Sequence, residues 1–151
     1  QEEARELART REQRERLAAE RARERAAATR AEYRYYRAGR YYFTDRSGAF
    51  ALRRAVRYGY REGYRAGDLD EGRGRPFDFR SNLLYRDADY GFLGYGGVIS
   101  LFDYSDYFRE GFWRGYQDGY YHRTQYGYLF GGVPTVSGPV LSSILGFALL
   151  P

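Results

Sequence analysis

The stretch YGYREGYRAGDLD (residues 58–70) places Gly59, Gly63 and Gly67 four residues apart in a segment that otherwise has the composition of a charged helix. At 3.6 residues per turn, residues four apart form one slowly winding stripe on a helix surface. Ala51 and Ala55 continue this stripe towards the N-terminus. Each interior glycine costs a helix about 1 kcal/mol relative to alanine. We therefore predict that the stripe is a groove against which another helix packs closely.

The pattern occurs twice. GFWRGYQDG (residues 111–119) repeats GYREGYRAG (residues 59–67) with glycine on glycine, which indicates an internal duplication. Ridges of side chains four residues apart pack into grooves of the same kind. We therefore predict two glycine-zipper helices packed as a hairpin, either within one chain or between copies. The second groove consists of Gly111, Gly115 and Gly119, and the aromatic ridges consist of Tyr60, Tyr64, Phe108, Phe112, Tyr116 and Tyr120.

The predicted fold is mainly α and begins with an extended charged helix. Residues 1–38 are rich in Arg, Glu and Ala and contain no glycine or proline, which predicts one helix that reaches about Tyr36. Its large apolar side chains, Leu7 and Leu17, are too few for a strong coiled-coil seam. A solvated helix and a helix docked on a partner are both compatible with this composition.

Residues 39–126 form the duplicated helical body. We expect its helices at about residues 49–72 and 103–122, with Asp103 as the N-cap of the second and Ser105 or Asp106 as alternative starts. An irregular glycine-rich connection joins them. A short strand is expected at residues 98–102.

Residues 127–151 are the most hydrophobic part of the chain. After the breaker GGVPTVSGP, Ser137 and Pro139 are expected to start a short helix. The apolar run is about half of the roughly 20 residues that a membrane-spanning helix needs, so we expect an assembly tail that docks on a neighbour. Its candidate contact residues are Val140, Leu141, Ile144, Leu145, Phe147, Leu149 and Leu150.

Side chains for catalysis or metal binding are scarce. The chain has no cysteine and one histidine, His122, which we expect to interact with a helix C-terminus. The acidic cluster at residues 68–71 departs from EF-hand spacing and is expected to pair with arginines such as Arg73 and Arg75. We therefore predict no enzyme, no cofactor and no metal site.

All 25 basic residues are arginines, and the formal net charge is +5. Alternating Arg and Tyr is typical of proteins that bind nucleic acids or acidic glycans. Because the chain also has 20 acidic residues, we favour pairing of the arginines, within the chain or between subunits, with Asp78, Asp87, Asp89, Asp103 or Asp106. The possible anion face is Arg53, Arg57, Arg61 and Arg65, which share one helix face.

The pieces GYREGYRAG, GRPFD, YRDADYGF and FREGFWRGY lie between Gly59 and Tyr116. In these pieces the chain resembles small exported proteins of acidobacteria that are rich in Gly, Tyr and Arg and have no assigned function. The resemblance covers roughly the central 40% of the chain and implies no activity. The charged helix and the hydrophobic tail lie outside it.

A charged helix with few apolar residues and a tail with many favour a protein that assembles. Because the chain starts at Gln1 without a signal sequence, we expect a mature exported form, extracellular, periplasmic or at the cell surface. We predict a structural subunit of an exported filament or envelope array, with copies of itself as partners. The alternatives are a binder of polyanions or acidic glycans, with nucleic acid less favoured, and an accessory subunit of a larger envelope or membrane complex.

Overall fold

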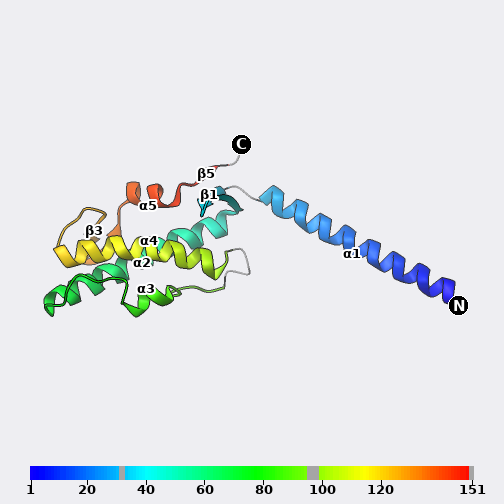
Figure 1. Ribbon diagram of the computed structural model, residues 1–151. Helices are drawn as coiled ribbons and strands as arrows, with labels where there is room; N and C mark the ends of the chain where they lie inside the picture. The colour runs from blue at the N-terminus through cyan, green and yellow to red at the C-terminus, as the bar shows by residue number, and fades with distance from the viewer. Residues whose placement is uncertain (31–32, 95–98, 150–151) are drawn as a thin grey trace.

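The computed structural model describes residues 1–30, 33–94 and 99–149 (Figure 1). The fold is mainly helical, as predicted. A long N-terminal helix projects from a body built of the remaining elements. In chain order these are α1 (Glu2–Arg30), β1 (Tyr33–Arg37), β2 (Arg40–Thr44), α2 (Arg46–Gly72), α3 (Leu83–Asp87), α4 (Leu101–Tyr121), β3 (Gly127–Phe130), β4 (Val133–Val136), α5 (Gly138–Leu145) and β5 (Ala148–Leu149).

Helices α2 and α4 form the centre of the body and run in the same direction. Gly59 faces the backbone of Phe108 and Phe112, whereas Gly67 faces that of Tyr116 and Tyr120. Residue numbers thus rise together along both helices, and both run from right to left in Figure 1. The predicted hairpin arrangement is therefore wrong. Residues 73–94 carry the chain back along α2 (Figure 1), and α4 starts beside the beginning of α2 and lies parallel to it.

The first helix is shorter than predicted, because Tyr33–Arg37 is a strand and not helix. It pairs with Arg40–Thr44 in an antiparallel hairpin, and tyrosine favours such half-buried pleated surfaces. Ala38 and Gly39 join the strands with φ of 50° and 81°. Two positive φ values in a two-residue loop are the geometry that matches the twist of a hairpin. Residues 33–38 therefore belong to the body.

The start of α4 also differs from the prediction. Ser100 is the N-cap, and its hydroxyl accepts a hydrogen bond from the backbone N–H of Asp103 at 3.1 Å. Leu101 and Phe102 are helical and not in a strand, while Val98 lies outside the described residues. The apolar run was misread because strand and helix cannot be distinguished by periodicity over so few residues.

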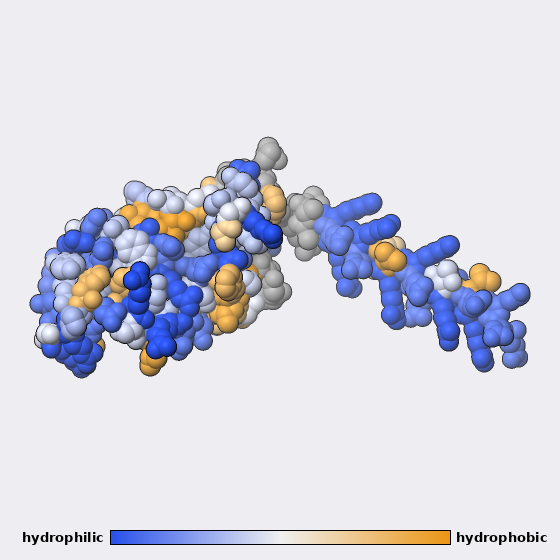
Figure 2. Space-filling model, in the orientation of Figure 1, coloured by the Kyte–Doolittle hydropathy of each residue, from blue (hydrophilic) through white to orange (hydrophobic). Residues whose placement is uncertain are grey.

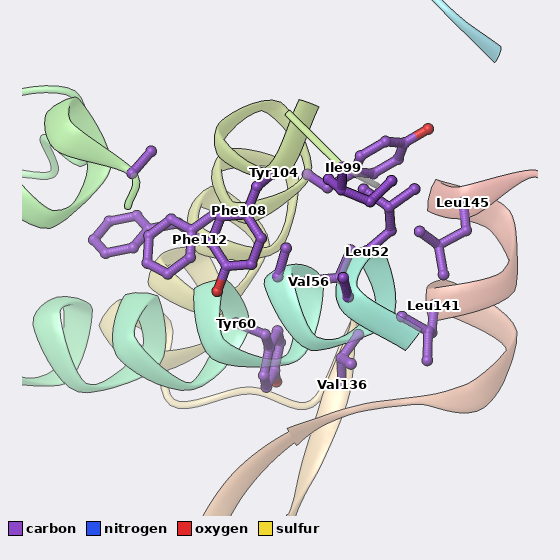
Figure 3. Close-up of a cluster of buried hydrophobic side chains, with 14 of the residues drawn as sticks. Leu52, Val56, Tyr60, Ile99, Tyr104, Phe108, Phe112, Val136, Leu141 and Leu145 are labelled. Carbon is purple, nitrogen blue, oxygen red and sulfur yellow. The ribbon is translucent and has the colours of Figure 1, made fainter. Parts of the chain in front are cut away.

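The C-terminal region folds onto the same chain. The short helix starts as predicted, with the Ser137 hydroxyl accepting from the N–H of Val140 and Pro139 in the first turn. The antiparallel pair β3–β4 precedes it and was not predicted. Val136, Leu141 and Leu145 are buried together with Leu52 of α2 (Figure 3). Leu141 and Leu145, which we expected to dock on a neighbouring subunit, are thus part of the hydrophobic core of their own chain.

Candidate functional site

Every glycine of the two predicted grooves lies at the α2–α4 contact. A methyl group added to Gly63 would lie 2.8 Å from the carbonyl carbon of Phe112 and closer still to its oxygen. The relation is reciprocal, because a methyl group on Gly115 would lie 2.7 Å from the carbonyl carbon of Tyr60. Both distances are shorter than real Cβ contacts, and the neighbouring atoms are backbone. Ala51 and Ala55 extend the stripe as fully buried residues.

Because the backbones touch, the ridge side chains lie beside the helix crossing rather than between the helices. Figure 3 shows Phe108 and Phe112 on one side of α2 and Tyr60 on the other. These three side chains and that of Tyr116 are completely or almost completely buried. Tyr64 and Tyr120 are partly buried against the same core.

Two of the buried ridge tyrosines donate hydrogen bonds to carboxylates. The Tyr60 hydroxyl lies 2.8 Å from Asp118 Oδ2, and the Tyr116 hydroxyl lies 2.6 Å from Asp70 Oδ2. Burial, reinforced by the bond to Asp118, raises the pKa of Tyr60. Burial, reinforced by the bond to Asp70, raises the pKa of Tyr116 to about 12. These hydroxyls are therefore neutral donors at physiological pH that hold α2 and α4 together.

The four arginines of the possible anion face do not act as one surface. Arg53 stacks over the Tyr33 and Phe147 rings at 5.7 and 5.1 Å. Arg61 and Arg65 both contact Glu62, at 3.0 and 3.2 Å, and Arg57 is exposed. Two of these arginines are thus paired with an acidic residue of their own chain, but this residue is Glu62 of α2 and none of the aspartates named from the sequence.

The predicted tail residues line a shallow surface pocket of about 380 Å³. Leu141, Leu145 and Phe147 form its apolar side, and Arg53 and Ser142 add polar groups. Val140 and Ile144 are partly buried against the core. Leu149 pairs with Tyr33 in the β1–β5 ladder, and Leu150 lies outside the described residues.

The C-terminal ends of α2 and α4 are linked by charged side chains. His122 caps α4 with a φ of 50°, and its Nε2 lies 2.8 Å from Glu71 Oε2. This hydrogen bond raises the pKa of His122. Arg75 pairs with Asp70 at 3.2 Å, as predicted. Within the described part of the chain, no group of three or more His, Cys, Asp or Glu residues could hold a metal ion.

The two hairpin strands β1 and β2 present a second arginine- and tyrosine-rich surface, which we call the hairpin face. Arg34 and Phe43 form one cross-strand pair and Tyr36 and Tyr41 the next, so these four side chains share one side of the sheet. Tyr36, Tyr41 and Phe43 are 56–59% exposed. The Tyr36 and Tyr41 rings meet edge to face at 5.1 Å, and the Arg34 guanidinium lies 4.4 Å from the Tyr41 ring centre.

The hairpin face was missed because the segment was read with a helical period. The signal for it was a pair of short runs rich in tyrosine and phenylalanine, YRYYR and RYYFT, separated by the two residues Ala38–Gly39. The opposite side of the hairpin points into the body. There Tyr35 donates to Asp103 at 2.8 Å, and Arg37 contacts Asp103 and Asp106 at 2.6 and 2.9 Å.

Helix α1 is the other large exposed surface. Each side chain from Gln1 to Ala26 is exposed, and Figure 2 shows a hydrophilic surface with two separate apolar spots. Leu7 and Leu17 are 72% and 51% exposed. Arg11 pairs with Glu15 and Arg16 with Glu12, each one turn apart, which stabilises a helix that stands in solvent.

No helix among the described residues is long and apolar enough to span a membrane. Searches against protein-family models, curated proteins and solved structures find no match for this chain. The resemblance to the acidobacterial proteins therefore stays a prediction, and any function has to be argued from the surfaces above.

Proposed function

We propose that this chain is a structural subunit that assembles with copies of itself, as part of an exported filament or envelope array. The observation that carries the proposal is the exposure of α1 beside a body that already fills its own core. Because Leu141 and Leu145 are buried within their own chain, we assign the main contact between copies to α1 rather than to the C-terminal tail.

One face of α1 is complementary to itself. Ala4, Ala8, Ala18 and Ala22 lie on this face, interrupted by Arg11 and Glu15. In an antiparallel pair of α1 helices centred on residue 13, Ala4 lies opposite Ala22 of the partner subunit and Ala8 lies opposite Ala18 of the partner subunit.

Arg11 and Glu15, the two charged residues that interrupt the alanine face, are also complementary to each other in charge. In the same arrangement Arg11 lies opposite Glu15 of the partner subunit, and the two-fold axis repeats this contact. The small side chains allow close approach, and the charges meet their opposites. This complementarity favours a second copy of the chain as the occupant of the face.

A two-fold contact alone ends at a dimer, so a filament needs another contact. The tip of the β3–β4 hairpin offers an exposed apolar surface at Leu129, Phe130 and Val133. In Figure 1 this hairpin lies at the end of the body remote from α1. Contacts at opposite ends of a subunit extend into an open chain, which supports a filament over a closed oligomer.

The test is the mass of the full-length protein in analytical ultracentrifugation over a range of concentrations. We expect dimers and larger species well above 17.7 kDa. Arg11→Glu places two glutamates on the self-complementary face and should yield monomers, and the double exchange Arg11→Glu with Glu15→Arg should restore association. Arg16→Glu is the matched control, because it breaks an equivalent ion pair on another side of α1.

Three results would contradict the proposal. The first is a wild-type protein that stays at 17.7 kDa at all concentrations. The second is equal loss of association in the Arg11→Glu and Arg16→Glu variants, which would indicate a general effect on the helix. The third is a native particle that contains a different polypeptide in fixed ratio, which would favour an accessory subunit. Circular dichroism of each variant shows whether α1 stays helical.

A further inference from the structure

The positive charge of the chain is concentrated at one place. Between Tyr33 and Arg57 the sequence contains seven arginines and one aspartate, a formal charge of +6 compared with +5 for the whole chain. This segment comprises the β1–β2 hairpin and the first three turns of α2. The rest of the molecule therefore carries no net positive charge, and any attraction for a polyanion is directed to this end of the body.

Part of this charge is neutralised inside the body, and part is exposed. Arg37 is paired with Asp103 and Asp106 beneath the hairpin. Arg40 and Arg57 are exposed, and Arg34 lies on the hairpin face with its guanidinium against the Tyr41 ring. The hairpin face thus combines Arg34 with three aromatic rings, and it lies within the most basic segment of the chain.

Cross-strand pairing explains only part of this surface. An aromatic pair such as Tyr36 and Tyr41 stabilises a hairpin by itself. Phe43, however, lies beside Arg34 and is 59% exposed, although it is the largest purely apolar side chain of the strand. Three exposed rings on five-residue strands, inside the most basic segment, are the combination on which single-stranded nucleic acids stack while arginines contact their phosphates.

We propose that the hairpin face binds single-stranded nucleic acid, with bases stacked on Tyr36, Tyr41 and Phe43 and a phosphate on Arg34. A duplex fits less well because its paired bases expose no ring faces for stacking. An acidic glycan would use the arginines without needing flat aromatic partners for bases. The site lies on the body and not on the self-complementary face of α1, so it is independent of the proposed self-association.

The test measures fluorescence anisotropy of a fluorescein-labelled 12-mer of deoxythymidine with the full-length protein. Tyr36→Ala and Tyr41→Ala should each weaken binding by at least about fivefold, the lower end of what loss of one stacking ring costs. Tyr36→Phe keeps the ring and should bind like the wild type. Tyr128→Ala, which removes a 47% exposed tyrosine from the other hairpin, is the matched control.

Two further measurements separate the possible ligands. Arg34→Gln should lower the slope of log K against log salt by about 0.7, the value for one phosphate contact of a single strand. A 12-base-pair duplex and heparin serve as competitors, and both should bind more weakly than the 12-mer. Because the three rings point outwards, their alanine variants should stay folded, and loss of the Tyr36–Tyr41 pair should lower the melting temperature by a few degrees at most.

The proposal is wrong if the 12-mer does not bind at 50 mM salt, or if Tyr36→Ala and Tyr41→Ala bind it like the wild type. Equal affinity for the duplex would show that only phosphates are recognised. An equal loss of heparin binding in the ring variants would assign the hairpin face to an acidic glycan instead.

Discussion

The close contact between α2 and α4 makes a sharp prediction for Gly63→Ala. The added methyl group would lie 2.8 Å from the carbonyl carbon of Phe112 and 2.9 Å from its Cα, where ordinary contact starts at 3.4 Å. These atoms belong to the backbone of a helix, so no single side chain can move to make room. The two helices would have to separate along their whole crossing.

The expected loss follows from that separation. A gap of about 0.5–1 Å removes a quarter to a half of the dispersion energy between the facing atoms, and overpacking typically costs up to about 3 kcal/mol. Because alanine has a higher helix propensity than glycine, the substitution also stabilises α2 by about 1 kcal/mol. We therefore expect the free energy of unfolding to fall by about 2 kcal/mol, and the melting temperature by about 4–8 °C for a protein of this size.

The assay is urea unfolding followed by fluorescence of Trp113, the single tryptophan, which lies in α4 and therefore reports on the body. Gly72→Ala is the matched control. It lies in the same helix with open space around it, so it should be neutral or slightly stabilising. Gly115→Ala, the duplicated counterpart, should lose about as much as Gly63→Ala. If Gly63→Ala is as stable as the wild type, the backbones of α2 and α4 are not in close contact.

Three other predictions concern the polar groups of the body. A proton NMR titration of His122 should give a pKa above 6.5, because its partner Glu71 favours the charged form; the stabilisation is present below pH 6.5 and lost as the pH rises through the raised value, and Glu71→Gln should lower the pKa. Burial raises the pKa of Tyr107 and of Tyr116 to about 12 each. The two neutral hydroxyls should therefore stabilise the folded protein fully below pH 10, and this stabilisation should be lost as the pH rises towards 12. Absorbance at 295 nm should show that both tyrosines ionise after the exposed tyrosines and together with unfolding. Asp118→Ala should cost about 1–3 kcal/mol in urea unfolding, because the buried carboxylate accepts from the Tyr60 hydroxyl and from the N–H of Tyr126; a smaller loss than that of Tyr60→Phe would contradict this role.

The sequence predicted the helices of the body well because their small and aromatic residues recur with a strict period of four. That period identified both partners of the contact, including Gly59 and Gly111. It did not indicate their relative direction. A groove and a ridge fit whether helices run parallel or antiparallel, and the period of four does not distinguish the two arrangements.

The hairpins were missed for a different reason. Tyrosine is favoured in strands but also tolerated in helices. Its presence alone therefore does not decide the secondary structure, which depends on what the segment packs against. At Tyr33–Thr44 the context is tertiary, because Tyr35 and Arg37 find Asp103 on α4, 68 and 66 residues later in the chain. No local pattern contains that information. The hairpin face is the outer side of this segment and was therefore missed with it.

The packing of α2 and α4 also explains the rest of the body. Since the helix backbones touch, the large aromatic rings have to lie on either side of the helix crossing. There, other parts of the chain have to pack on them to shield them from solvent. On one side Phe77 lies 5.1 Å from Tyr116, and Tyr85 lies 5.6 Å from Phe112. On the other side Gly127 of β3 approaches the Tyr60 ring so closely that a side chain has no room.

The connections that follow α2 and α4 therefore act as two covers for the aromatic side chains that the glycines displace. This gives the C-terminal region a role inside its own chain and removes the need for a neighbour to bury Leu141 and Leu145. Among the described residues, the surfaces that we propose for partners are α1, the hairpin face and the tip of β3–β4. Of these, α1 and the hairpin face meet at the same end of the body (Figure 1). In the antiparallel α1 pair the two bodies would lie at opposite ends of the helices, about 50 Å apart at a rise of 1.5 Å per residue. A nucleic acid strand long enough to reach both hairpin faces would then bind more tightly than one confined to a single face.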